Sequence, residues 1–351
     1  MLSSNSLVQW LRWLIPRLSL PLLVLNGWAI LVLIDYFKTP LTILVVGAVI
    51  AFLLDHPLQW LERRRIKRVP AILILVLATV GLLGVVGVTL LPLLAQQAQD
   101  LVTNFPTWQQ SANQQVRFLH NWLQSRGMPI DVSGMAANVT DQLSKQLQAI
   151  ATWIPGFLEG TIGSIFEFFL IIVVIVYLLL KGDSLWNGIF DWFPGPLGQR
   201  LQTTLPRSFR NYFIGQGTVA LLLGTTLAIA LSLFRVPYGF LFGVFIGLLA
   251  LFPYGGTVGI TLVSLLLAFK SIGLGLTVLA IATVVDQVVE NGIAPRLMGH
   301  LTGVHPVWVV MAILIGGKVA GLLGVVLAVP IASTVKDVME IYKPRRSRKS
   351  A

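Results

Sequence analysis

Cysteine is absent from the 351 residues of the sequence, and charged residues are scarce. The absence of cysteine excludes disulfide bonds, thiol catalysis and metal sites built from thiolates. Asp, Glu, Lys and Arg make up 11% of the chain, whereas an ordinary soluble domain carries about 25%. Because 56% of the residues are hydrophobic, we do not expect a soluble domain.

Long apolar stretches take the place of the missing charge. They lie at 18–34, 41–54, 70–95, 160–180, 213–234, 238–294 and 306–335. A membrane-spanning helix needs roughly 20 apolar residues, and these stretches are continuous rather than alternating. The sequence therefore predicts an all-α, polytopic helical membrane protein with about eight membrane segments, two of them broken, re-entrant helical hairpins.

Basic residues give the chain a formal net charge of +11 and cluster beside the apolar stretches, in RRRIKR at 63–68 and PRRSRK at 344–349. Such clusters set membrane topology and contact anionic lipid. We therefore expect the lipid bilayer as their partner, cytoplasmic termini and no nucleic-acid binding. No small-residue cleavage pattern follows the first apolar run, so we expect a retained first span rather than a signal peptide.

The composition divides the chain into five expected regions. These are three spans over 1–95, an extracytoplasmic amphipathic helical region over 96–158, span 4 with a cytoplasmic interfacial segment over 159–212, a core of spans and hairpins over 213–337, and a basic cytoplasmic tail over 338–351. In the second region apolar residues recur three and four apart, with Pro106 near a break. Packing against the chain's own spans or a neighbouring subunit is favoured there over ligand binding.

Two of the apolar stretches are interrupted by glycine and proline. FPYGG at 252–256 divides 238–270 into two arms of 14 residues, and GGKVAG at 316–321 divides 306–335. Fourteen residues give roughly 21 Å of helix, which is short of a hydrocarbon core of about 30 Å. Each stretch is therefore one kinked span or a hairpin that enters the membrane and returns.

The loop 295–305 separates these alternatives, because two hairpins place it in the cytoplasm and two kinked spans place it outside. It contains Arg296 and two histidines but no acid, so the positive-inside rule favours two hairpins. Span 5 at 213–234 and span 6 at 272–294 are then each followed by a hairpin. The two hairpins enter from opposite sides, as in the inverted repeats of secondary transporters. The alternative is that both breaks are kinks in a packed bundle.

Asp286 and Glu290 are the only acids between residues 192 and 336. They are four positions apart and share a helix face, and Gln287 with Asn291 forms a second pair on the adjacent face. A charged side chain at the bilayer centre costs about 2.5–3.5 kcal/mol on insertion scales. Partners or water are therefore expected there. The structural alternative for Glu290 is an ion pair with the nearby arginine of the following loop.

The expected substrate- or ion-binding residues lie at the two breaks, in this polar segment and at the start of span 5. They are Gln216, Pro253, Tyr254, Gly255, Gly256, Asp286, Gln287, Glu290, Asn291, Gly317 and Lys318. An enzyme is not expected, because both acids lie on one segment and the four histidines lack metal-ligand spacing. GGK around Lys318 lacks the other residues of a phosphate-binding loop. No cofactor and no metal site are expected.

The C-terminal third resembles the autoinducer-2 exporter family of bacterial transporters, through LFPYGGTVG, DQVVENGIAPRLMG and GVHPVWVVMAILIGGKVAGLLGVVLAVPIAS. The glycine and proline positions match over about 213–337, and the span order matches over most of the chain. One departure is Thr257, where the family motif has proline. The resemblance implies a homo-oligomeric, pentameric inner-membrane protein with two hairpins around its substrate and an elevator-like movement.

Three functions stay open from the sequence. The first is export of a small polar molecule held by the hairpin tips and span 6. The second, also implied by the family, is exchange of sodium or lithium for protons through Asp286 and Glu290, since neighbouring carboxylates can share a proton. The third is a scaffold or channel whose external helical region binds partners.

Overall fold

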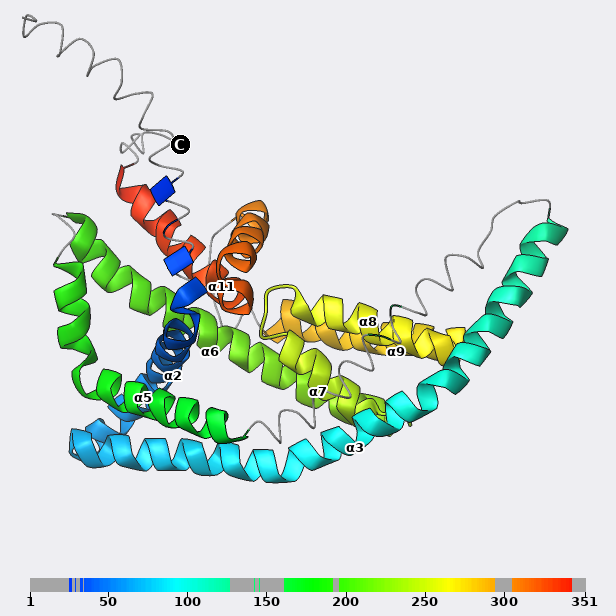
Figure 1. Ribbon diagram of the computed structural model, residues 1–351, viewed down its shortest axis with the longest axis horizontal. Helices are drawn as coiled ribbons and strands as arrows, with labels where there is room; N and C mark the ends of the chain where they lie inside the picture. The colour runs from blue at the N-terminus through cyan, green and yellow to red at the C-terminus, as the bar shows by residue number, and fades with distance from the viewer. Residues whose placement is uncertain are drawn as a thin grey trace, which may run out of the picture.

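The structure is a computed structural model and describes residues 25–26, 29, 32–33, 35–126, 142, 145, 161–191, 196–293 and 305–342. Within these ranges the regular secondary structure is helical and contains no strand (Figure 1). The helices are α2 Lys38–Arg63, α3 Arg68–Ser125, α5 Thr161–Phe190, α6 Pro196–Leu233, α7 Gly239–Leu249, α8 Gly255–Lys270, α9 Ile272–Gln287, the π-helix η1 Val288–Ile293, and α11 Pro306–Tyr342.

Six helical segments of the described residues are long and apolar enough to cross a membrane. They lie in α2, α3, α5, α6, α9 with η1, and α11, and two shorter apolar helices, α7 and α8, lie between them. The prediction of an all-α, polytopic helical membrane protein is confirmed. The expected first span falls mostly outside the described residues.

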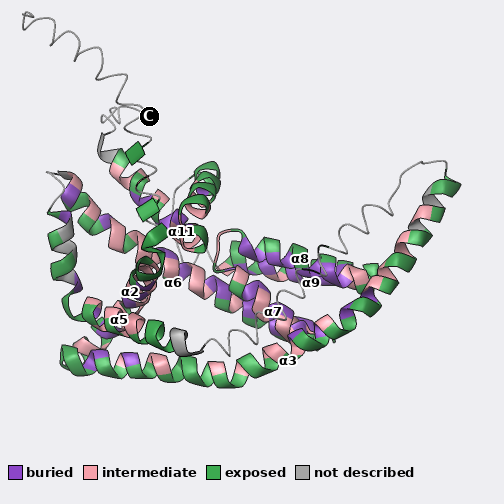
Figure 2. Ribbon diagram, in the orientation of Figure 1, coloured by how far each residue is buried: buried purple, intermediate pink, exposed green. Residues whose placement is uncertain are grey.

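The buried side chains form two main clusters, which Figure 2 shows as separate patches along the ribbon. The N-terminal cluster joins α2, the start of α3 and α5. Its buried members are Ala51, Leu58, Ala71, Ile72, Val76, Ile175 and Leu179. The larger cluster, here called the hairpin cluster, joins α6, α7, α8, α9 and outer α3, which is the half of that helix ending at Ser125. It is centred on Leu223, Leu227, Leu231, Ile246, Leu267 and Val278.

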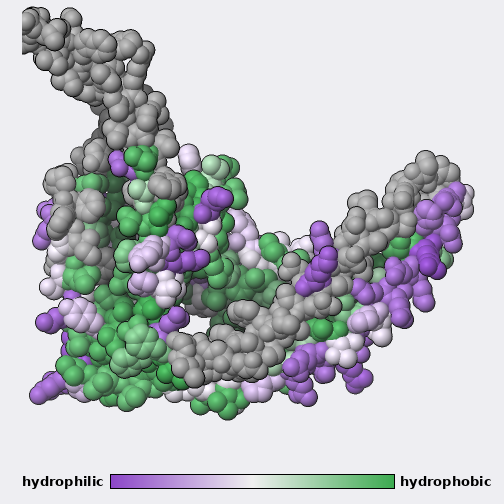
Figure 3. All heavy atoms as spheres, in the orientation of Figure 1, coloured by the Kyte–Doolittle hydropathy of each residue, from purple (hydrophilic) through white to green (hydrophobic). Residues whose placement is uncertain are grey.

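Helix α3 is one helix of 58 residues that continues through Pro92 and Pro106. The expected boundary between residues 95 and 96 therefore falls inside a helix, and no break occurs at Pro106 although proline removes one backbone hydrogen bond. Packing explains this continuity, because Phe105 and Trp108 on either side of Pro106 are buried in the hairpin cluster. Hydrophilic side chains gather over the outer half of α3, whereas apolar ones cover its first half (Figure 3).

Polar side chains of outer α3 also bind the two ends of the segment α7–α8. The Oε1 atom of Gln97 accepts from Leu241 N at 3.1 Å, and the Oε1 atom of Gln115 accepts from Ile272 N at 3.0 Å. The rings of Trp108 and Tyr238 pack in a tilted arrangement, with 6.0 Å between their centroids. The Nζ atom of Lys270 lies 5.7 Å from the centroid of the Trp108 ring. Both ends of this segment therefore pack against α3.

Helices α7 and α8 form a hairpin, here called hairpin 1, whose tip is the turn 250–254. Gly259 on the second arm lies against Ile246 on the first, since a methyl group on Gly259 would come 3.3 Å from Ile246 Cα. The first arm packs closely on α6: a methyl group on Gly243 would lie 2.2 Å from Ala228 N. These contacts require small residues on the first arm, namely Gly239, Gly243 and Gly247, which all lie against α6.

Helix α11 reverses direction at Ala320 and Gly321 and forms the second hairpin, here called hairpin 2. Gly321 has a φ of 58° and a ψ of −137°, a conformation open mainly to glycine. A methyl group on Gly316 would lie 2.4 Å from the carbonyl oxygen of Gly324, so residues eight positions apart touch. In a straight helix they would be about 12 Å apart. Residues 294–304 lie outside the described residues, so the cytoplasmic location of that loop stays a prediction.

Candidate functional site

The tip of hairpin 1 is a tight turn made possible by glycine. Tyr254 ends the turn with a left-handed φ of 63°, and α8 begins at Gly255 and Gly256, both buried. A methyl group on Gly255 would lie 1.8 Å from the carbonyl oxygen of Leu249, so only glycine fits there. Pro253 is half-buried, whereas Tyr254 is 52% exposed and directed away from the packed tip.

Asp286 of α9 faces this tip and is 4% exposed. A methyl group on Gly256 would lie 3.3 Å from the Oδ1 atom of Asp286, which places the carboxylate beside the first residues of α8. Backbone N–H groups in a first helical turn lack intrahelical partners and favour negative charge nearby. Nevertheless, no donor among the described residues forms a hydrogen bond with this Oδ1 atom.

Gln216 of α6 contacts the other side of the tip. Its Nε2 atom donates a hydrogen bond of 2.6 Å to the carbonyl oxygen of Ala250, at the C-terminal end of α7. Leu223 lies two turns further along α6 and also faces Gly256: a methyl group on Gly256 would lie 3.1 Å from Leu223 Cδ2. Three elements therefore meet at one place: α6, the tip of hairpin 1, and α9.

The other polar residues of span 6, Gln287, Glu290 and Asn291, follow Asp286 within about one helical turn. Asn291 Nδ2 donates to Gln287 Oε1 at 2.5 Å, and both residues are exposed. Glu290 is also exposed, and Val289 is the buried residue of η1. A π-helix is rare and occurs mostly as a short segment, frequently at functional sites. The structure thus separates a buried acid at the tip from an exposed polar group after it.

The position of Asp286 along α9 sets its depth. It lies fourteen positions after Ile272, which corresponds to about 21 Å of helix. The apolar helical segment Ile272–Ile293 has 22 residues, so Asp286 lies beyond its middle, towards Ile293.

Hairpin 2 packs mainly on α6, where Val309, Ile313 and Val329 surround Tyr212 and Phe213. These α6 residues lie one turn before Gln216, so both hairpins contact the same stretch of α6. At the tip of hairpin 2, a methyl group on Gly317 would lie 3.3 Å from Val325 Cγ2, and Lys318 is exposed. No hydrogen bond of the described residues joins Gly317 or Lys318 to Asp286, and the approach of the two tips stays a prediction.

Two groups at the site were missed by sequence reasoning, namely the side chain of Leu223 and the carbonyl of Ala250. A leucine inside an apolar helix gives no signal of its own. The carbonyl belongs to the backbone, and it can accept from Gln216 because α7 ends there at the turn of FPYGG, which marked its neighbours instead.

Comparison with known proteins gives a consistent result over almost the whole chain. Residues 18–344 match the sequence profile of a family described as AI-2E family transporter. A protein of Synechocystis sp. whose name describes it as a candidate transport protein is 43% identical over 332 residues, which cover 94% of this chain and 96% of the relative. A second Synechocystis protein with the same kind of name is 38% identical over 339 residues, covering 95% of this chain and 86% of the relative. The AI-2 transport protein TqsA of Escherichia coli is 23% identical over 333 residues, covering 91% and 94%.

Proposed function

Since the chain belongs to the AI-2E transporter family, we propose that it is a secondary transporter that exports a small polar molecule bound between hairpin 1, α6 and α9. The family and the apolar helices make it a multi-pass membrane transport protein. The substrate class, the direction of transport and the movement belong to the proposal. So do location in the inner membrane with both termini in the cytoplasm, and assembly as a homo-pentamer.

The observation that carries the proposal is the unpaired Oδ1 atom of Asp286. A buried polar atom without a hydrogen bond costs about 1–3 kcal/mol, and more when it is charged. The atom lies at the tip of hairpin 1, between α8 and α9, where a ligand would reach both. A bound solute with a hydroxyl or amine donor would satisfy it, and an anion would be repelled.

The other groups at the tip suit the same kind of solute. Gln216 offers its side-chain oxygen while its nitrogen holds Ala250, and the first N–H groups of α8 are donors. Acceptors and donors on three elements recognise a neutral or cationic molecule that carries several hydroxyl groups. The E. coli relative is named for transport of AI-2, and its name does not identify the molecule for this chain.

Separate hydrophobic clusters support a movement of one part of the protein against another. The substrate groups all belong to elements of the hairpin cluster, whereas α2, α5 and the start of α3 pack in the N-terminal cluster. An elevator-like movement would carry the hairpin cluster with its bound solute past the N-terminal cluster. Helices α3 and α6 connect the two clusters.

The second candidate function is exchange of sodium or lithium for protons, and a specific observation favours it. Glu290 lies one helical turn from Asp286, so a proton displaced from one carboxylate could pass to the other. A scaffold or channel remains the third alternative, and the same experiment separates it from the others.

Flux into proteoliposomes tests these functions with Asp286→Asn, which keeps the shape of the side chain and removes its charge. Hydrogen bonds to charged groups contribute about 1.5–3 kcal/mol, so we expect about 10- to 100-fold slower solute flux. The matched control is Glu167→Gln, which removes an exposed acid of α5 far along the chain from the site. Both variants should express and assemble as the parent does.

Three outcomes of the flux measurement distinguish the candidate functions. Loss of sodium- or lithium-driven proton movement without loss of solute flux would favour exchange. Rapid flux that does not saturate as the solute concentration rises, and that is driven only by the gradient of the permeating solute or ion itself, would favour a channel. Undiminished flux of solutes and ions through folded Asp286→Asn protein would show that the carboxylate does not belong to the transport site.

A further inference from the structure

A cavity of about 660 Å³ lies away from Asp286, between α2, the start of α3, α5 and α6. Its wall is formed by α2 and α5 on one side and by the first half of α6 on the other. None of the transport-site residues lines it. The cavity therefore requires its own explanation.

The charged residues of the wall are mainly basic. Arg68 comes from the start of α3, and Arg207 and Arg210 lie three positions apart on one face of α6. Asp55 of α2 is the one acid among the described residues of the wall, and Glu62 lies beside Arg68. Three guanidinium groups against these two carboxylates leave a net positive charge that selects an anion.

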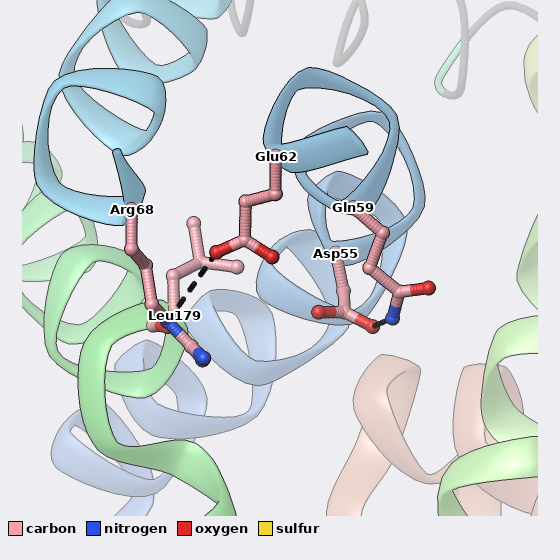
Figure 4. A network of polar contacts seen from close by, with 5 residues as sticks. All are labelled: Asp55, Gln59, Glu62, Arg68 and Leu179. Atoms are coloured by element: carbon pink, nitrogen blue, oxygen red, sulfur yellow. Dashed lines mark hydrogen bonds and ion pairs between the residues drawn. The ribbon is translucent and has the colours of Figure 1, made fainter. Parts of the chain in front are cut away.

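Arg68 is held in position by neighbouring protein groups (Figure 4). Its Nε and Nη2 atoms donate to the carbonyl oxygen of Leu179, at 3.1 Å and 2.7 Å, and Glu62 lies 3.9 Å from Nε. The carbonyl accepts these bonds because α5 bends at Lys181, which has non-helical dihedral angles. Asp55 accepts a hydrogen bond of 2.8 Å from Gln59 on its own helix (Figure 4).

Arg207 and Arg210 differ from Arg68 in that other described side chains do not hold them in position. Neither makes an ion pair or a side-chain hydrogen bond with another described residue. Arg207 is exposed and Arg210 is half-buried, so the two side chains can turn their donors into the cavity without breaking a contact. A guanidinium group presents paired donors that match the oxygens of a phosphate.

The remainder of the wall is apolar on the side of the membrane helices. Ala48, Ala51 and Phe52 of α2 and Leu178 of α5 line this part, and all four belong to helices apolar enough to span the membrane. The cavity is therefore amphipathic. A free inorganic ion would leave this apolar wall unused, whereas a phospholipid would cover it with the beginning of its acyl chains.

We propose that this cavity binds a phosphate group, and that the phosphate belongs to the headgroup of an anionic phospholipid. Arg207 and Arg210 donate hydrogen bonds to the phosphate, and Arg68 supplies fixed positive charge. The α2 side of the wall contacts the glycerol and the upper part of the acyl chains. Basic pockets between membrane helices commonly bind such headgroups. The lipid would contact α2 and α6 together, and so connect the two hydrophobic clusters.

The test is native mass spectrometry of the detergent-purified full chain, titrated with phosphatidylglycerol and, in parallel, with phosphatidylcholine. The variant Arg207→Gln/Arg210→Gln removes the two guanidinium groups that donate to the phosphate. Each basic residue near an anionic lipid contributes about 1 kcal/mol, so the variant should bind phosphatidylglycerol about 30-fold more weakly. The control variant Arg117→Gln/Arg235→Gln loses the same amount of charge at exposed positions outside the cavity and outside the basic clusters, and should bind as the parent does.

A further variant, Arg207→Lys/Arg210→Lys, keeps the charge and loses the forked donors. It should recover part of the affinity, which also serves the test if the glutamine variant does not fold. Equal weakening by the Arg117→Gln/Arg235→Gln control would overturn the proposal, since general surface charge would then explain binding. Inorganic phosphate that binds the protein while phosphatidylglycerol does not would overturn the assignment to a lipid.

Discussion

Replacement of Gly256 by alanine places one methyl group between hairpin 1 and the buried acid. The new methyl carbon would lie 3.1 Å from Leu223 Cδ2 and 3.3 Å from Asp286 Oδ1. Both contacts are a few tenths of an ångström too short, so Leu223 and Asp286 must shift. Overpacking of this kind costs about 1–3 kcal/mol, and alanine returns up to about 1 kcal/mol through its better helix propensity.

The net cost to folding therefore lies between about 0 and 3 kcal/mol, and transport should fall in protein that still folds. The methyl group occupies the space in which a solute would meet Asp286 Oδ1. A loss of about 1.4–3 kcal/mol of solute binding would slow flux by about 10- to 100-fold at low solute concentration. Flux into proteoliposomes measures this loss, and thermal unfolding of the same preparation measures the stability.

Gly217→Ala is the matched control. It lies on α6 beside Gln216, it gains the same helix propensity, and a methyl group there meets nothing within 4 Å. Normal flux is expected from this control. If Gly256→Ala protein also transports at the parent rate and unfolds at the parent temperature, the solute does not bind between the hairpin tip and Asp286.

Three further predictions test the fold and topology. Gly243→Val should abolish folded protein, as judged by size-exclusion chromatography, because a methyl group there would already lie 2.2 Å from Ala228 N and separate α6 from α7. Gln115→Ala should lower the free energy of unfolding by about 1–2 kcal/mol through loss of its bonds to Ile272 N and Phe269 O, whereas exposed Gln114→Ala should not. A cysteine introduced at Thr302 should react with an impermeant reagent only from the cytoplasmic side, and labelling from outside would refute the two-hairpin topology.

The sequence was sufficient to find the breaks because glycine and proline act locally. FPYGG and the glycines of GGKVAG predict interruptions from the conformations that their own residues allow, and the structure has a turn at each. The choice between a kink and a hairpin depended instead on loop charge, which is weak information. In the structure that choice is decided by contacts between the arms, Gly259 with Ile246 and Gly316 with Gly324.

Helix lengths were less predictable, because hydropathy marks where a span leaves the apolar layer and not where its helix ends. Outer α3 is polar, and its continuation as a helix depends on hairpin 1, which is more than a hundred positions later in the sequence. Gln97 and Gln115 gave no signal as partners of that hairpin. Their amides act on backbone N–H groups at its two ends, and backbone groups carry no sequence signature.

The two candidate sites differ in the same physical sense. Asp286 stood out because an isolated acid in an apolar segment costs free energy wherever the segment packs, so its rarity is visible before the fold is known. In the proposed lipid cavity, Arg68 comes from the basic cluster 63–68, whereas Arg207 and Arg210 were ordinary members of a polar segment, and the three come together only where α3 and α6 meet. Arg68 and Arg207 lie 139 positions apart, and the excess of positive charge exists only in the assembled cavity. A site that depends on one costly residue can be found from sequence, whereas a site that depends on several inexpensive residues from different helices requires the structure.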